Sequence, residues 1–379
     1  MRRVMIEQLE PGMIVGRTVS GADGRPLLTQ NMQLSDKYIQ KLRNIGIASV
    51  YIKDTFTDIE IPEVVSSEVL TKVASNLKSS LTNLSAQKAI DTNILKKGVS
   101  MLIDDILSNR HLLVHLEDIH SYNDYLFFHS VNVAILSIMT GLSMGYNDGD
   151  MADLGLGALL HDIGMIMLDQ NVVNKAEKLT PAEMTEVRNH PETGFNMLRN
   201  QREVSAPAAH IAYQHHERFD GTGYPRKMMR KQILEYARIA AVADTFDALT
   251  TDHPYRKAYS TTEALIIIKK LAGTHFDPDI VAAFQSNVAL YPIGSMVLLN
   301  TGHIAVVTSS TRINQEKPII HVICDQNGKM VKKFFKVDLS RTAEVIVVRH
   351  LSKEETNSIH HKVKYDKATK EKERQSAAV

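Results

Sequence analysis

Seven side chains that suit a metal site fall within one stretch of the sequence, between positions 129 and 247. They are imidazoles and carboxylates: His129, His161, Asp162, His190, His215, His216 and Asp244. Most of them lie in segments expected to be helices with apolar neighbours, where an unpaired polar group is costly to bury. Borderline and hard divalent metals take imidazole together with carboxylate. Because two metals sharing a bridging carboxylate can activate water for attack on a phosphate, the pattern predicts a metallo-hydrolase centre.

Taken singly, each of these histidines has an ordinary structural explanation. His129 on an apolar helix could be a core histidine bonded to the backbone, and His190 could cap the helix that starts beside it. His215 and His216 are adjacent, so on a regular helix they point about 100° apart. Either one is a ligand and the other supports it, or both bind metal from a distorted helix end. Together, in this order, the histidines favour ligation.

The acidic residues have more specific settings. Asp162 ends an expected buried helix, directly after Ala158-Leu159-Leu160 and His161, where its carboxylate could bridge two cations. Asp244 follows the apolar run Ile239–Ala243, in which an unpaired acid is unfavourable unless a cation meets it. Asp247 lies one turn further on and is expected to support the site without being a ligand.

The elements that must position these residues divide the chain into five parts. Residues 1–60 are expected to form a small α+β regulatory domain, and 61–110 a helical linker with the first core helix. The catalytic domain is expected at 111–288, followed by a β-rich segment at 289–350 and a disordered tail at 351–379. We therefore predict a mainly α protein, an all-helical bundle flanked by a small α+β domain and a small β-rich segment.

Gly and Pro punctuate the expected helices of the bundle. Helices are expected over residues 126–142, 151–163, 191–200, 206–217, 233–249, 261–272 and 278–286. Residues 219–227 contain Gly221, Gly223 and Pro225 and are predicted to be a loop. Strands are expected over residues 296–299, 304–307, 319–323 and 345–348, where the apolar period changes to two.

Composition excludes several classes. A net charge of +1 gives no case for binding a nucleic-acid polymer or an anionic membrane. No stretch approaches the roughly 20 apolar residues of a membrane span, and the N-terminus lacks the apolar core of a signal peptide. The single cysteine, Cys324, is expected to be a buried thiol in a strand. We therefore expect a cytoplasmic protein without a membrane span.

The complete set of motifs resembles the HD-GYP family, a subgroup of the HD phosphohydrolases. The resemblance covers about half of the chain and rests on His161-Asp162-Ile163-Gly164, His190-Pro191-Glu192-Thr193-Gly194, His215-His216-Glu217, Asp220-Gly221-Thr222-Gly223-Tyr224-Pro225, Ala243-Asp244-Thr245-Phe246-Asp247-Ala248-Leu249 and Pro254-Tyr255-Arg256. The N-terminal module, with Leu9-Glu10-Pro11-Gly12-Met13, resembles a domain of unknown role that often precedes HD-GYP domains.

The resemblance implies a phosphodiesterase that hydrolyses cyclic di-GMP to linear pGpG, and often on to GMP, through a metal-bound hydroxide. It implies that all seven donors are metal ligands, usually of iron or manganese, with Asp162 as the bridging catalytic residue. It assigns substrate binding to Gly223, Tyr224, Pro225, His253 and Arg256. For Tyr224, packing of a loop aromatic against the bundle is an equal alternative.

Three positions depart from the family pattern. Members with three metals carry a Glu one turn before the first His, where this chain has Tyr125, so we predict two divalent ions. The usual Lys after the His-Asp-Ile-Gly run is Met165, and a common Arg is His253. Each lost cationic contact to phosphate is worth roughly 1.5–3 kcal/mol.

These departures leave other functions open. The chain could be a weak or inactive module that binds a cyclic dinucleotide and signals to protein partners, or it could act on a different cyclic dinucleotide. The sequence also leaves open a homodimer formed through the helices of residues 61–110. His275-Phe276-Asp277-Pro278 is interpreted as a helix start and not as chemistry.

Overall fold

The computed structural model describes residues 1–20, 26–45, 47, 49–53, 62–85, 90–114, 125–173, 175, 177–251, 258–311, 315–352, 354–356 and 358–359. Contacts divide the chain into two compact units. One contains Arg3–Lys53 and Pro62–Val288, and the other is built mainly on the chain from Ala289 onward.

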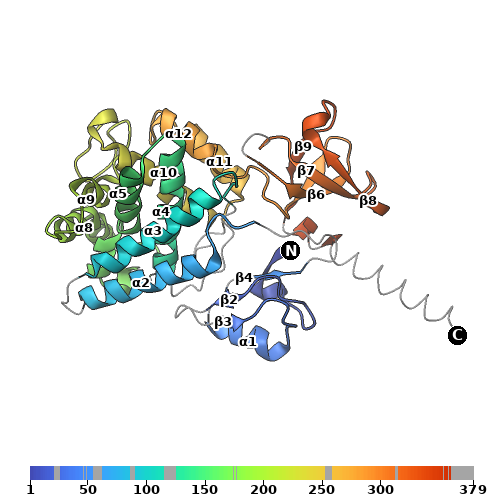
Figure 1. Cartoon of the computed structure of the whole chain (residues 1–379), viewed down its shortest axis with the longest axis horizontal. Helices are drawn as coiled ribbons and strands as arrows, with labels where there is room; N and C mark the ends of the chain where they lie inside the picture. The colour runs from blue at the N-terminus through green and yellow to red at the C-terminus, as the bar shows by residue number, and fades with distance from the viewer. Residues whose placement is uncertain are drawn as a thin grey trace. The chain divides into compact units, whose positions relative to one another are not determined.

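Most of the first unit is a helical bundle (Figure 1). Its elements are α2 (Ser67–Ser85), α3 (Thr92–Ser108), α4 (Tyr125–Ser143), α5 (Asp148–Leu159), η3 (Ile163–Met167), α6 (Gln170–Val173), α7 (Pro181–Arg188), α8 (His190–Leu198), α9 (Ala206–Gln214), η4 (Arg230–Gln232), α10 (Glu235–Thr250), α11 (Thr261–Lys270) and α12 (Pro278–Gln285). The predicted mainly α fold is confirmed.

Helix α4 forms the core of the bundle. It packs against α5, α10, α2 and α12, and Val131, Ala134 and Ile138 are fully buried. By length and composition alone, the window Leu126–Ser143 could cross a membrane, but 78% of it is buried inside the bundle. α4 is therefore apolar because it is a core helix, and its side chain His129 is buried within the bundle.

Two glycine contacts bring the segments with the predicted ligands together. A Cβ on Gly157 of α5 would lie 2.7 Å from the carbonyl oxygen of Ala208 in α9, and a Cβ on Gly164 of η3 would lie 2.1 Å from the carbonyl oxygen of His190 in α8. Only glycine permits these backbone approaches. They join the His-Asp turn to α9 on one side and to α8 on the other.

Two helices end earlier than the sequence predicts. α5 stops at Leu159 and not at Ile163, and α9 stops at Gln214 and not at Glu217. The reason is local, because Nδ1 of His161 bonds to the carbonyl oxygen of Ala158, and Nδ1 of His215 to that of Ala212. These side chains satisfy carbonyls of the last turn. α5 also begins three residues earlier than predicted, at Asp148, and the other predicted bounds of the bundle helices agree to within two residues.

The remaining elements lie at the two ends of the chain. The N-terminal module contains β1 (Arg2–Met5), η1 (Ile6–Gln8), β2 (Val19–Ser20), β3 (Pro26–Leu28), α1 (Asp36–Ile45) and β4 (Ser49–Ile52), and β1 pairs with β4. The C-terminal elements are β5 (Met296–Leu299), β6 (Ile304–Ser309), β7 (Ile319–Cys324), β8 (Met330–Asp338), η5 (Leu339–Arg341) and β9 (Val347–His350). The strands form one antiparallel sheet in the order β8-β7-β6-β5-β9.

The sheet confirms some predicted strands and adds one. Cys324 is a buried thiol at the end of β7, as predicted. β9 begins at Val347 and not at Val345. β8 was not predicted, because its lysines hide the apolar alternation. It is an edge strand whose exposed face carries Lys333 and Phe335, and polar side chains are common on such edges.

We predict that replacing Gly157 with Ala lowers the free energy of unfolding by about 1–3 kcal/mol, since an added methyl overpacks a backbone contact. α5 and α9 would have to separate, which moves His161 away from His215. Urea denaturation measures the loss. Gly149→Ala, on the exposed first turn of the same helix, is the control and should change stability little. Equal stabilities for the two variants would contradict the account.

Candidate metal centre

The structure brings all seven predicted donors together in two neighbouring groups. The first group contains His129, His161 and Asp244, and the second group contains Asp162, His190, His215 and His216. Within each group the donor atoms lie within 4.8 Å of one another. Five separate segments supply them: α4, the turn after α5, the start of α8, the end of α9, and α10. These groups are the ones found among the residues that the structure describes.

The carboxylate of Asp162 lies between the two groups. Its Oδ2 is 3.4 Å from Nε2 of His161 in the first group. Its Oδ1 is 3.2 Å from Nε2 of His190 and 3.5 Å from Nε2 of His215 in the second group. One oxygen therefore faces each group, which is the arrangement that a bridging carboxylate needs.

Backbone hydrogen bonds set the tautomers of three histidines. Nδ1 of His161 donates to the carbonyl oxygen of Ala158 (2.8 Å), and Nδ1 of His190 donates to that of Val187 (2.6 Å). Nδ1 of His215 is 3.0 Å from a carbonyl oxygen in the preceding turn. A carbonyl can only accept, so Nδ1 carries the proton and Nε2 keeps its lone pair in the neutral ring.

These lone pairs face one another in the protein interior. Nε2 of His190 and Nε2 of His215 are 3.2 Å apart, and two acceptors at that distance repel. Nε2 of His161 is buried without a hydrogen-bond partner among the described residues. A buried acceptor without a donor is costly, and a cation bound at each of the two groups would remove this cost for the three rings. This donor set therefore fits a divalent metal.

Without a cation, the carboxylates and histidines of the site balance one another's charge: burial would lower the pKa of His161, but Asp162 raises it above its usual value. Burial would raise the pKa of the Asp162 carboxyl, but the neighbouring histidines, His161 above all, hold it well below its usual range. Burial also opposes ionisation of Asp244, and its hydrogen bond with His129 outweighs that and lowers its pKa. Burial and His215 lower the pKa of His216 well below its usual value. Ionised carboxylates and a neutral imidazole are the forms that bind metals.

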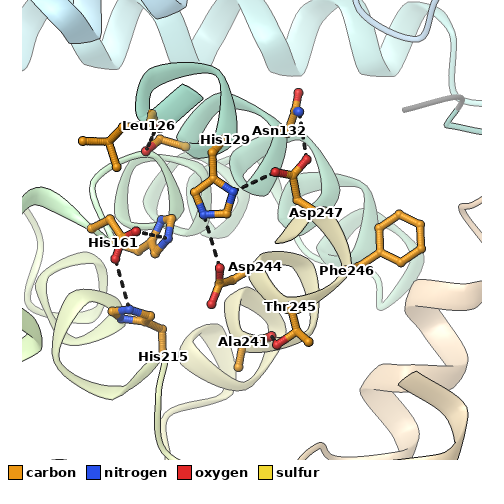
Figure 2. Close-up of polar contacts among 12 residues, drawn as sticks. Leu126, His129, Asn132, His161, His215, Ala241, Asp244, Thr245, Phe246 and Asp247 are labelled. Atoms are coloured by element: carbon orange, nitrogen blue, oxygen red, sulfur yellow. Dashed lines mark hydrogen bonds and ion pairs between the residues drawn. The ribbon is translucent and has the colours of Figure 1, made fainter. Parts of the chain in front are cut away.

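Asp247 supports His129 from behind and belongs to neither group (Figure 2). Its Oδ2 accepts a hydrogen bond of 2.7 Å from Nδ1 of His129, which directs Nε2 of that ring toward Asp244 at 3.2 Å. Asn132 donates to the other oxygen of Asp247 (2.8 Å). Asn132 was not predicted, although its position three residues after His129 places it on the same helix face.

A buried acid that sequence reasoning also missed holds the loop beside the second group. The Glu217 carboxylate accepts hydrogen bonds from the backbone amides of Arg226 (2.6 Å) and Met228 (2.9 Å). Gly223 lies so close to this turn that a Cβ would be 2.5 Å from the carbonyl oxygen of His216. The predicted loop is thus tied to the chain that carries His215 and His216.

Tyr224 lies on the second group. Its ring stacks on His216, with centroids 4.8 Å apart and planes at 25°, and its amide donates to the carbonyl oxygen of His216 (3.2 Å). The Tyr224–Pro225 peptide is cis. Packing of this aromatic is therefore observed, while contact of Gly223, Tyr224 and Pro225 with substrate stays a prediction.

The other predicted positions have mixed outcomes. His253 and Arg256 lie outside the described residues. Met165 is half-buried in η3, three residues after Asp162. Asp277 caps α12 and pairs with Arg238, so the interpretation of this segment as a helix start is confirmed.

Comparison with known proteins identifies the family. The "HD domain" family matches residues 103–280, and a "KOW domain associated with HD domain" matches residues 296–359. "Cyclic di-GMP phosphodiesterase PA4108" of Pseudomonas aeruginosa is 30% identical over 375 residues, which cover 91% of this chain and 90% of that protein. The chain belongs to the HD-GYP family. The predicted family is therefore confirmed.

Other known proteins match smaller parts of the chain. "3'3'-cGAMP-specific phosphodiesterase 3" of Vibrio cholerae is 30% identical over 228 residues, 59% of this chain and about half (49%) of that protein. The solved structure of Bd1817, described as an HDG"Y"P protein from Bdellovibrio bacteriovorus, has a TM-score of 0.52 at 18% identity and covers 75% of this chain and 97% of that one. At this identity the likeness shows a common fold.

We predict that replacing Asp247 with Asn weakens metal binding by about 10- to 100-fold, as expected when a group that orients a ligand is lost. Metal per chain, measured by mass spectrometry after dialysis against a graded chelator series, reports the change. Asp150→Asn is the control, since Asp150 accepts a hydrogen bond from Tyr236 (2.8 Å) and belongs to neither donor group. Metal retention equal to that of the unaltered protein across the series would refute the role of Asp247.

Proposed function

We propose that this chain is a metal-dependent phosphodiesterase that hydrolyses cyclic di-GMP to linear pGpG, and further to GMP. One observation carries the proposal: Asp162 directs one carboxylate oxygen to each of two groups of donors. Two-metal centres of phosphatases and nucleases use a shared carboxylate in this way. The Pseudomonas relative bears the name of the same activity.

The donor set suggests two divalent ions, with iron or manganese as the expected metals. The first group would hold one ion, and His190, His215 and His216 would hold the other, with Asp162 shared between them. Such ions supply Lewis acidity toward a phosphate and lower the pKa of water. Mixed imidazole and carboxylate ligation suits these metals.

The protein's own residues supply binding and orientation. The backbone carbonyls at the ends of α5, α7 and α9 fix the rings of His161, His190 and His215, so no rearrangement is needed at the moment of reaction. We propose that Gly223, Tyr224 and Pro225 form one wall of the substrate site. His253 and Arg256 are proposed to contact phosphate.

Two observations favour alternatives that remain within the family. Met165 replaces a cation close to Asp162, which favours a weak or inactive module that binds the nucleotide and passes a signal to partners. Similarity to a relative named for 3'3'-cGAMP favours a different cyclic dinucleotide as substrate. In either case we propose that the N-terminal domain (1–60), the helical linker (61–110), the β-rich segment (289–350) and the tail (351–379) pass a signal to or from the catalytic domain (111–288). We propose that this takes place in the cytoplasm, in a monomer or a homodimer.

The main test is release of linear pGpG from cyclic di-GMP by protein loaded with manganese or ferrous iron. The variant His161→Ala with Asp162→Ala should lose activity by more than about 100-fold, because even groups behind a ligand contribute 10- to 100-fold. Circular dichroism shows whether the variant is folded. Turnover by the unaltered protein no faster than by the double variant would reject the hydrolase, and binding without turnover would select the signalling module.

A second test addresses Met165. Met165→Lys should raise activity toward cyclic di-GMP by about tenfold or more if the site lacks a phosphate contact, because a charge-assisted hydrogen bond contributes about 1.5–3 kcal/mol. Met167→Lys is the matched control, since Met167 lies two residues further on and is 61% exposed. No gain at position 165, or the same gain at both positions, would show that the missing lysine does not limit this site.

A further inference from the structure

A second aromatic contact of Tyr224 leads away from the donor groups. The Tyr224 ring stacks on His216. The same ring contacts Arg188, whose guanidinium carbon lies 5.5 Å from the ring centroid. His190 and His216 are themselves in ring contact, with centroids 5.0 Å apart. A continuous set of contacts therefore runs from the second donor group through Tyr224 to the charge of Arg188.

The backbone holds Arg188 at this place. Arg188 is the last residue of α7, and α8 begins two residues later at His190. The carbonyl oxygen of Val187 accepts the hydrogen bond from Nδ1 of His190. The residue before Arg188 is thus hydrogen-bonded to the imidazole of His190, two residues after it, which fixes where the arginine leaves the chain.

The guanidinium of Arg188 is not neutralised by a neighbouring acid. The side chain is exposed, and no acid forms an ion pair with it in the described part of the chain. The charge of Arg188 also acts on Tyr224. Burial, Asp162 and Asp244 raise the pKa of Tyr224, and Arg188 lowers it. The phenol thus senses both the carboxylates of the donor groups and this guanidinium.

We propose that Arg188, steadied by the ring of Tyr224, binds the second phosphodiester of the substrate, the one that is not being cleaved. This inference rests on the proposed function, because a cyclic dinucleotide carries two phosphodiesters and a metal centre engages one. Arg188 contacts the ring of Tyr224, which in turn contacts His216, so the guanidinium suits a second phosphate beyond the donor groups and not the scissile one. A planar guanidinium matches phosphate oxygens and stacks on aromatic rings.

The experiment compares affinity for a hydrolysis-resistant phosphorothioate analogue of cyclic di-GMP, measured by calorimetry on the metal-loaded protein. Arg188→Gln should weaken binding about 10- to 100-fold, the contribution of one charge-assisted contact. Arg188→Lys should recover part of the loss, because it keeps the charge but not the planar fork. The loss for Arg188→Gln should shrink at high salt, which a purely structural role for the side chain would not produce.

A matched control lies at the other end of α8. Arg199 also places its guanidinium over an aromatic ring, 5.8 Å from the centroid of Phe195, and it follows the last residue of the helix that His190 begins. Arg199→Gln should leave binding of the analogue unchanged. A single-phosphate diester, bis(p-nitrophenyl) phosphate, serves as a second probe, and Arg188→Gln should lose at least tenfold more activity toward cyclic di-GMP than toward this compound.

The outcomes separate this inference from the proposed function. Equal affinities of the Arg188→Gln and Arg199→Gln variants for the analogue would overturn the role of Arg188, even if hydrolysis of cyclic di-GMP proceeds. Weakened binding in Arg188→Gln alone, without any turnover by the unaltered protein, would support the role of Arg188 and reject the phosphodiesterase. Absence of binding to the unaltered protein would overturn both.

Discussion

The fold depends on a local excess of buried acceptors over donors. Three imidazoles give their Nδ1 protons to backbone carbonyls, so their Nε2 lone pairs meet one another and an ionised carboxylate in the interior. The first group also contains His129: burial would lower the pKa of this ring, but Asp244 and Asp247 raise it well above its usual value. That group therefore draws in a proton when no other positive charge is supplied. A divalent cation would stabilise each group, because it would accept imidazole lone pairs and balance the negative charge of the carboxylates.

The scaffold concentrates its close contacts around this centre. Gly157 and Gly164 let α5, η3, α8 and α9 approach at backbone distance, and α5 and α9 end just before the donors His161 and His215. Each helix end thereby serves two purposes, since the same histidine satisfies a terminal carbonyl and turns Nε2 inward. Glu217 extends the arrangement outward by holding the loop that carries Tyr224. The rigidity needed for catalysis is thus present in the resting protein.

Much of the site could be predicted from residue types alone, because imidazoles and acids are unfavourable in apolar helices unless something compensates them. The bridging position of Asp162 and the supporting position of Asp247 agree with what the apolar runs around them indicated. The ends of α5 and α9 could not be predicted, because a side chain bonded to a carbonyl of its own helix has no signal in hydrophobic periodicity. Asn132 and Glu217 were missed for a related reason: their partners, Asp247 and two backbone amides, become neighbours only in the folded chain. Strand β8 was missed because its lysines interrupt the apolar alternation. The contacts of His253 and Arg256 stay predictions.

The central claim is that the two donor groups hold a pair of divalent ions with Asp162 between them. Anomalous X-ray diffraction from crystals of the metal-loaded protein, recorded on either side of the manganese or iron absorption edge, tests it most directly. The account predicts two peaks about 3.5–4 Å apart, one beside His129 and Asp244 and the other beside His190 and His216. Crystals without a peak at either group, in which these side chains instead bond to one another or to water, would contradict it.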